Sequence, residues 1–167
     1  MLAQRSTASP ILLTTTVNGS IGGLVGITAG CASMAPGFAL LSGLVAGFVV
    51  VYGMRLLDRL QLDDVVGAVP VHGFAGIWGT LAAGLFYQGD LFNWARVGVQ
   101  ALGVVAAFLW AFPLSLLVYL LLAKTIGLRV STQHEQRGLD FAEHAEVGYP
   151  EFNQTQTFDS EQWSRRG

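Results

Sequence analysis

The sequence predicts an all-α, polytopic membrane protein with four transmembrane helices and a polar C-terminal tail. Of its 167 residues, 52% are hydrophobic and 12% are charged, which is too apolar for an ordinary soluble domain of this size. Asp, Glu, Lys and Arg do not occur in residues 6–54, 65–89 and 97–123. The first of these blocks is long enough to cross a bilayer twice, because roughly 20 apolar residues span its hydrocarbon core.

The transmembrane region is predicted over residues 1–128, with helices at about 11–30, 38–55, 64–86 and 97–126. In the first helix, Gly22, Gly26 and Gly30 recur at every fourth position and form a groove without side chains. Such a groove lets another helix approach closely in lipid. After a short turn at 31–37, Gly43 and Gly47 repeat this spacing in the second helix.

Charged residues mark the connection to the third helix. Arg55, Asp58 and Arg59 predict a polar loop, and Asp63 and Asp64 open the helix that follows. Adjacent carboxylates at a helix start could be metal ligands or a proton pair, but they are far more often caps for the free N–H groups. We therefore interpret both aspartates as structural caps.

The third helix holds His72, the only ionisable group placed deep inside an apolar segment. Pro70 has no N–H, and its ring crowds the carbonyl four residues earlier, which predicts a kink or break just before His72. Counting 3.6 residues per turn, small residues share the face of His72, so a neighbouring backbone or a narrow pore can approach the imidazole. They are Ala68, Ala75, Gly76 and Gly79. A histidine hydrogen-bonded to a neighbouring helix is the alternative interpretation, and the residues leave both open.

The rest of the chain predicts a loop, a long helix and a tail. Residues 87–96 predict a loop with interfacial aromatic side chains, and residues 97–126 one long tilted helix with a second kink at Pro113. From residue 127 the sequence is polar and mixed in charge. The tail, 129–167, is predicted to lie in water, with short helical turns around 139–146 and disorder over 153–167.

Several function classes are excluded. No basic run with interleaved aromatics supports nucleic-acid binding, and outside the apolar blocks no nucleophile, base and orienting group occur together, so an enzyme is not predicted. His134 and His144 lack a second ligand at metal-binding spacing, and no metal or cofactor is predicted. Cys31 is the only cysteine and is interpreted as a small core residue.

The distribution of Lys and Arg predicts the orientation. With four crossings, Arg5, the loop at 55–59 and the basic residues of the tail share one side, which leaves only Arg96 on the other. The positive-inside rule then places both termini in the cytoplasm of a multi-pass cell-membrane protein. The N-terminus begins polar and lacks the pattern of a secretory signal peptide, so we interpret the whole chain as mature.

Four blocks of residues occur in order along the chain. They are Asn18-Gly19 with Gly-Leu-Val-Gly-Ile-Thr-Ala-Gly-Cys at 23–31; Asp58-Arg59-Leu60 with Asp63-Asp64; Val71-His72-Gly73 with Gly-Ile-Trp-Gly-Thr at 76–80; and Gly-Leu-Arg-Val at 127–130 with Gly138-Leu139-Asp140 and His144. Together they resemble the C-terminal part of an ammonium transporter of the Amt/Mep/Rh family, from about residue 12 to 149. Two departures are Val65, where members usually have Pro, and Ala145, where the tail usually reads His-Gly-Glu.

The resemblance implies a trimer of eleven-helix protomers, each with a narrow apolar pore crossed by ammonia, ammonium or both. His72 matches the second of two pore histidines, and Ala68 is placed with it on the pore. Arg129 and Gly138 match the tail segment that couples neighbouring protomers beneath the pore. Only the last four of eleven helices have counterparts here, so the first pore histidine and the cation-recognition residues are assigned to no position.

Two functions follow from the resemblance. In the first, the chain transports ammonium or ammonia when the remaining helices are supplied by another chain. In the second, it is a truncated, non-transporting membrane module that associates with full-length protomers and acts through its tail. The expected partners are the bilayer, those helices or protomers in a trimeric assembly, and a PII-type signalling protein at the cytoplasmic face.

Overall fold

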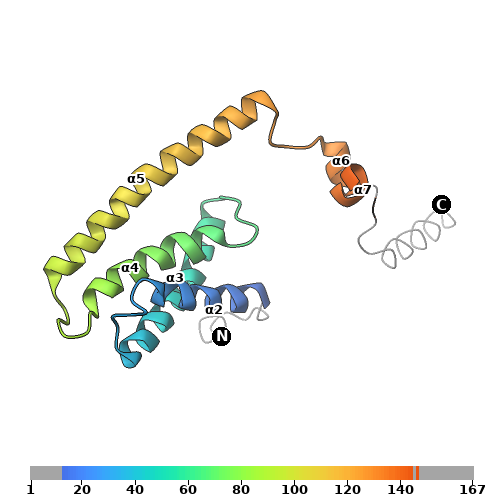
Figure 1. The fold of residues 1–167 in the computed structure, drawn as a ribbon. Coiled ribbons are helices and arrows are strands. Elements are labelled where there is room, and N and C mark those ends of the chain that lie inside the picture. Colours follow the sequence, from blue (N-terminus) through green and yellow to red (C-terminus); the bar gives the residue numbers. More distant parts are fainter. Residues whose placement is uncertain (1–12, 145, 147–167) are drawn as a thin grey trace. The chain divides into compact units, whose positions relative to one another are not determined.

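The computed structural model describes residues 13–144 and 146, and its regular elements there are helices, which confirms the all-α class (Figure 1). Their bounds are α2 Leu13–Thr28, α3 Pro36–Arg59, the π-helical turn η1 Val69–Phe74, α4 Ala75–Leu85, α5 Trp94–Thr125, α6 Thr132–Arg137 and α7 Leu139–His144. The described residues form two compact units, one ending at Phe112 and the other beginning at Pro113. This division falls inside α5, so each unit is described by itself.

Helices α2, α3 and α4 pack together in the first unit, and glycines make the close approach possible (Figure 1). Gly22 and Gly26 are buried in α2, where an added Cβ would overlap the side chains of Val50 and Ala46 in α3. The predicted small-residue groove is therefore confirmed for these two positions. Gly30 lies beyond the end of α2 and faces Met34 instead.

Two apolar clusters form the core of this unit. Ala46 and Val50 of α3 pack against Val71 and Ala75, which lie in or directly after η1. Near the end of α4, the ring of Phe86 stacks on Phe38 with centroids 4.9 Å apart. Small buried residues such as Ala46, Ala75 and Ala82 let the backbones come close, which constrains the relative helix positions.

A buried hydroxyl and an indole link the three helices. Ser42 of α3 is fully buried, and its Oγ donates to the carbonyl of Gly26 at 3.0 Å. Trp78 of α4 donates its Nε1–H to the carbonyl of Ser42, also at 3.0 Å. These bonds satisfy polar groups that would otherwise be buried without partners.

Two predicted boundaries are wrong. Helix α3 continues to Arg59, so Arg55, Asp58 and Arg59 lie in its last turns and not in a polar loop. Long charged side chains reach water from a terminal turn, and basic ones there favour the negative end of the helix dipole. The next helical segment begins at Ala68–Val69 and not at Asp64.

The sequence predicted a kink or break at Pro70, just before His72, and the helix has no break there. Residues 69–85 continue as η1 followed directly by α4, with Pro70 in the first turn. A proline is tolerated there, because the first N–H groups of a helix have no intrahelical partner to lose. Helix α5 continues through Pro113, and the second kink stays a prediction.

Two of the described helices, α3 and α5, are long and apolar enough to cross a membrane. Helix α2 has 16 described residues, and Val69–Leu85 is a shorter apolar helix. The four crossings therefore stay a prediction. Within the described part of the chain, no residue of α5 is buried, so its apolar side chains have lipid or another protein as their expected environment.

The second unit contains two short helices of the tail. The Ser131 side chain accepts from the His134 N–H at 3.3 Å and caps α6. Gly138, with a φ of 87°, separates α6 from α7. Helix α7 confirms the helical turns predicted around 139–146, whereas α6 was not predicted. The predicted disorder at 153–167 lies outside the described residues.

Candidate functional site

His72 lies in η1 on the surface of the first unit. Pro70 and Val71 beside it are buried against α2 and α3, whereas His72 and Gly73 are exposed. The π-helical turn is closed by a bond from the Ala75 N–H to the Pro70 carbonyl, five residues back. This wider turn brings the histidine to the outside while its neighbour in sequence fills the core.

The wider turn also changes which residues share a face with His72. Ala68 is exposed like His72, and Gly76 is partly exposed, but Ala75 and Gly79 are buried. The prediction that all these small residues line one face with His72 is therefore wrong for Ala75 and Gly79. It assumed 3.6 residues per turn throughout, which a π-helical turn does not have.

A glycine of α3 makes room for the turn. A Cβ on Gly53 would lie 2.6 Å from Cδ2 of Phe74 and 3.1 Å from Cβ of Pro70. Phe74 and Pro70 therefore rest directly on the α3 backbone. Close backbone contact of this kind fixes the turn more tightly than contact between flexible side chains would.

The start of the turn is held by Asp64. Its Oδ1 accepts from the Ala68 N–H at 2.8 Å and its Oδ2 from the Val69 N–H at 2.9 Å. Both carboxylate oxygens thus contact backbone groups at the positive end of the helix. Asp63 is exposed, so the two neighbouring carboxylates have different surroundings.

Asn18 of α2 contacts the same connection and was not assigned a role from the sequence. Its side chain is 7% exposed, and its Nδ2 donates to the carbonyl of Val66 at 2.9 Å. The signal in the sequence was an amide side chain in a Gly-rich apolar helix, a position where polar groups form interhelical hydrogen bonds.

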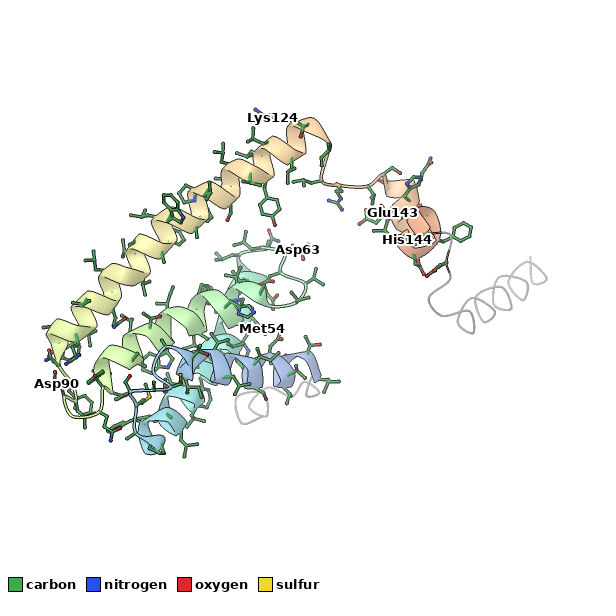
Figure 2. All side chains as sticks on the ribbon, viewed as in Figure 1. Met54, Asp63, Asp90, Lys124, Glu143 and His144 are labelled. Carbon is green, nitrogen blue, oxygen red and sulfur yellow. The ribbon has the colours of Figure 1, made fainter. Side chains whose placement is uncertain are left out.

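An ion pair lies at the end of the first unit opposite the connection that contains Asp63 and Asp64. Figure 2 shows Asp63 at one end of the unit and Asp90 at the other. Arg96 Nε lies 2.7 Å from Asp90 Oδ2, and the guanidinium carbon is 4.1 Å from the centre of the Tyr87 ring. The hydrogen bond from Arg96, helped by one from Asn93, holds the pKa of Asp90 below its usual value. The sequence predicted only a loop with aromatic side chains here, although the spacing of Asp90, Asn93 and Arg96 was visible.

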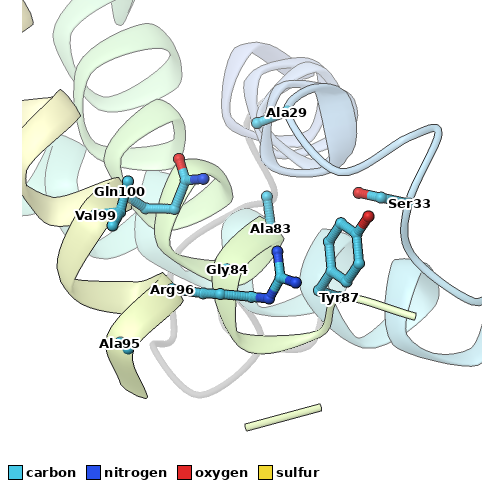
Figure 3. A pocket seen from close by; sticks show the side chains of 9 residues that line it. All are labelled: Ala29, Ser33, Ala83, Gly84, Tyr87, Ala95, Arg96, Val99 and Gln100. Atoms are coloured by element: carbon cyan, nitrogen blue, oxygen red, sulfur yellow. The ribbon is translucent and has the colours of Figure 1, made fainter. Parts of the chain in front are cut away.

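A cavity of about 350 Å³ lies beside this ion pair (Figure 3). It is lined by Ala29, Ser33, Ala83, Gly84, Tyr87, Ala95, Arg96, Val99 and Gln100. Neither His72 nor Ala68 is among these residues. The structure thus separates the cavity from the sequence-predicted pore residues.

The described residues contain no group of three or more His, Cys, Asp or Glu placed to hold a metal ion.

In the tail, Arg129 Nη2 contacts Glu135 Oε1 at 3.4 Å, and both side chains are exposed. This partner belongs to the same chain. Exposed pairs of this kind contribute little stability, so the contact leaves Arg129 able to exchange partners.

The sequence matches the model of the Ammonium Transporter Family over residues 1–149. The chain belongs to the ammonium transporter family. It is 43% identical to ammonium transporter Amt2 of Archaeoglobus fulgidus over 157 residues, which covers 85% of this chain and 34% of the relative. It is 42% identical to putative ammonium transporter sll1017 of Synechocystis sp. over 135 residues, covering 81% of this chain and 30% of the relative. The resemblance found in the sequence is confirmed, and the chain spans about a third of the length of these relatives.

Proposed function

We propose that this chain is the C-terminal part of an ammonium transporter and that His72 lines the path of ammonium or ammonia. The exposed imidazole of His72, on an otherwise apolar helix, is the observation that carries the proposal. Ionisable groups in transmembrane segments face a bundle interior or a water-filled cavity and rarely face lipid. A further set of helices on this face would give His72 such surroundings.

The same reasoning makes the chain dependent on those helices. Binding sites of inverted-repeat transporters form between the repeats, and four helices do not complete one repeat of an eleven-helix protomer. Large apolar side chains near His72, including Val69 and Ile77, are exposed and need lipid or protein against them. The proposed partners are the missing helices or full-length protomers in a trimer, and a PII-type signalling protein at the cytoplasmic face.

Uptake of methylammonium by cells lacking their own ammonium transporters tests the proposal. The chain is expressed alone, and again beside a fragment holding the first seven helices of the Archaeoglobus fulgidus relative. We expect uptake only from the pair, and loss or altered selectivity of that uptake with His72→Ala. His134→Ala, which changes an exposed tail histidine, is the control and should behave like the unchanged pair. Robust uptake by the chain alone contradicts the dependence on other helices, and unaltered uptake by His72→Ala contradicts the pore role.

The alternative function is a non-transporting module that associates with full-length protomers. The observation that favours this alternative is the tail, whose two helices α6 and α7 belong to the second compact unit. In that case the pair stays inactive, and the chain changes the uptake of a co-expressed full-length transporter. Truncation after residue 128 should then remove the effect.

The proposed location is the cell membrane, with four crossings and both termini in the cytoplasm. Cysteine labelling of intact cells tests it, with Cys31 replaced by Ser and new cysteines at Gln4, Asn93 or Ser160. We expect an impermeant probe to react at position 93 only. Reaction at positions 4 and 160 but not at 93 means that the orientation is inverted.

A further inference from the structure

A buried amide of α2 contacts the segment that leads into the His72 turn. Asn18 is 7% exposed, and its Nδ2 donates to the Val66 carbonyl at 2.9 Å. The same nitrogen lies 3.9 Å from Sδ of Met54 in α3, a weak acceptor. One amide thus connects α2, α3 and the segment before η1, at a position where a polar group without a bond would be costly.

Gly67, the residue that follows Val66, lies against the same amide. Gly67 is buried and has a φ of 74°, a left-handed conformation that favours glycine. A Cβ there would lie 2.5 Å from Nδ2 of Asn18. Asn18 therefore fills the space that the missing side chain of Gly67 leaves open.

The contact is linked to His72 by a short series of backbone bonds. The Gly67 carbonyl accepts from the Val71 N–H at 3.1 Å, and Val71 directly precedes His72. Asp64 holds the N–H groups of Ala68 and Val69. The backbone N–H groups of Ala68, Val69 and Val71 are therefore all held by residues 64–67. A shift of the Val66–Gly67 peptide would consequently move the whole first turn of η1.

We propose that Asn18 is a positioning residue for His72, which fixes the direction of the imidazole by holding the Val66–Gly67 peptide. The inference rests on the proposed role of His72 in transport. An amide suits the position because its N–H donates while the side chain stays uncharged. Asp would lack the donor at neutral pH and bring a charge, and Leu would leave the Val66 carbonyl without its partner.

Asn18→Ala tests the structural step in the 167-residue chain, reconstituted in nanodiscs. We expect hydrogen exchange of residues 67–74 to accelerate about tenfold, from the loss of one buried hydrogen bond. The ¹⁵N signals of the His72 imidazole, assigned with His72→Gln, should shift as well. Ser42→Ala is the matched control, because it removes another buried bond to α2, at Gly26, about two turns away from Asn18. It should leave both the exchange of residues 67–74 and the His72 signals unchanged.

Gly67→Ala approaches the same contact from the other side and keeps the test decisive if Asn18→Ala is poorly folded. It should shift the same His72 signals. Equal effects of Asn18→Ala and Ser42→Ala overturn the proposal, as does loss of helical circular dichroism in both Asn18→Ala and Gly67→Ala. If both variants lose their helical circular dichroism, Asn18 is needed for the folding of the whole first unit and not specifically for the position of the His72 turn.

Uptake by the pair described above separates this inference from the proposed function. We expect Asn18→Ala to lower uptake severalfold while membrane levels and Ser42→Ala uptake stay normal. If His72→Ala changes uptake but Asn18→Ala does not, the positioning role fails and the proposed function stands. If His72→Ala itself has no effect, the pore role fails, and the ¹⁵N signals still decide whether Asn18 positions the ring.

Discussion

Adding one methyl group at Gly79 should destabilise the first unit, because α4 crosses α2 there with backbone against backbone. A Cβ on Gly79 would lie 2.6 Å from the carbonyl oxygen of Gly26 and 2.9 Å from its carbonyl carbon and Cα. These are main-chain atoms and cannot rotate away as a side-chain tip would. On its other side Gly26 faces Ala46, so α2 has little freedom to retreat.

The expected magnitude follows from two opposing effects. Overpacking a filled interior costs about 1–3 kcal/mol. Replacing a helical glycine by alanine recovers about 0.5–1 kcal/mol of helix propensity. Gly79→Ala should therefore lower the free energy of unfolding by about 1 kcal/mol, or roughly fivefold in the ratio of folded to unfolded chain.

Gly76→Ala is the matched control in the same helix. Its nearest neighbour would be Cγ1 of Val25 at 4.0 Å, an ordinary contact distance, so only the gain in helix propensity remains. The purified chain in mild-detergent micelles is titrated with SDS, and helicity is followed by circular dichroism. The two variants should shift the midpoint in opposite directions. Equal midpoints, or a more stable Gly79→Ala, would refute the close backbone crossing.

Three further predictions concern charged and strained positions. Asp64→Ala removes both cap bonds and should cost about 1–2 kcal/mol in the same SDS titration, whereas Asp63→Ala should stay within about 0.5 kcal/mol. The pKa of Asp90 is lower in the folded chain than in the unfolded chain. The stability that its contact with Arg96 contributes is therefore complete above the unfolded pKa and is lost as the pH falls through the lowered folded pKa. A ¹³C carboxyl titration should accordingly give a higher midpoint for Asp90 in Arg96→Gln. Gly138→Ile, at a φ of 87°, should lower uptake by the pair without removing the chain from the membrane, and unchanged uptake would count against tail coupling.

The fold class and the glycine contacts could be predicted from the sequence. Composition reports directly on the membrane environment, and a glycine spacing of four residues places bare backbone on one helix face. The confirmed positions, Gly22 and Gly26, lie inside one regular helix where that counting holds. It does not hold for Gly30, because α2 ends at Thr28.

The surroundings of His72 could not be predicted in the same way. Gly53 of α3 leaves room for Phe74 and Pro70 of the π-helical turn, and no local pattern in the sequence shows that contact. Asn18 and Val66 are 48 residues apart, so their hydrogen bond exists only once α2 and α3 have packed. An ionisable side chain in an apolar segment thus identified His72 in the sequence, while contacts distant in sequence hold the turn that carries it.

The length and exposure of α5 have a consequence for how the chain enters a membrane during synthesis. With 32 residues, α5 is about 48 Å long and exceeds the roughly 30 Å hydrocarbon core. No residue of α5 is buried within the described part of the chain, so its apolar surface is free to contact lipid. Helices α2 and α4 are shorter and Gly-rich, and they gain their closest contacts from α3 and from each other. We expect α3 and α5 to partition into lipid independently, and the other two to be retained only after they have packed.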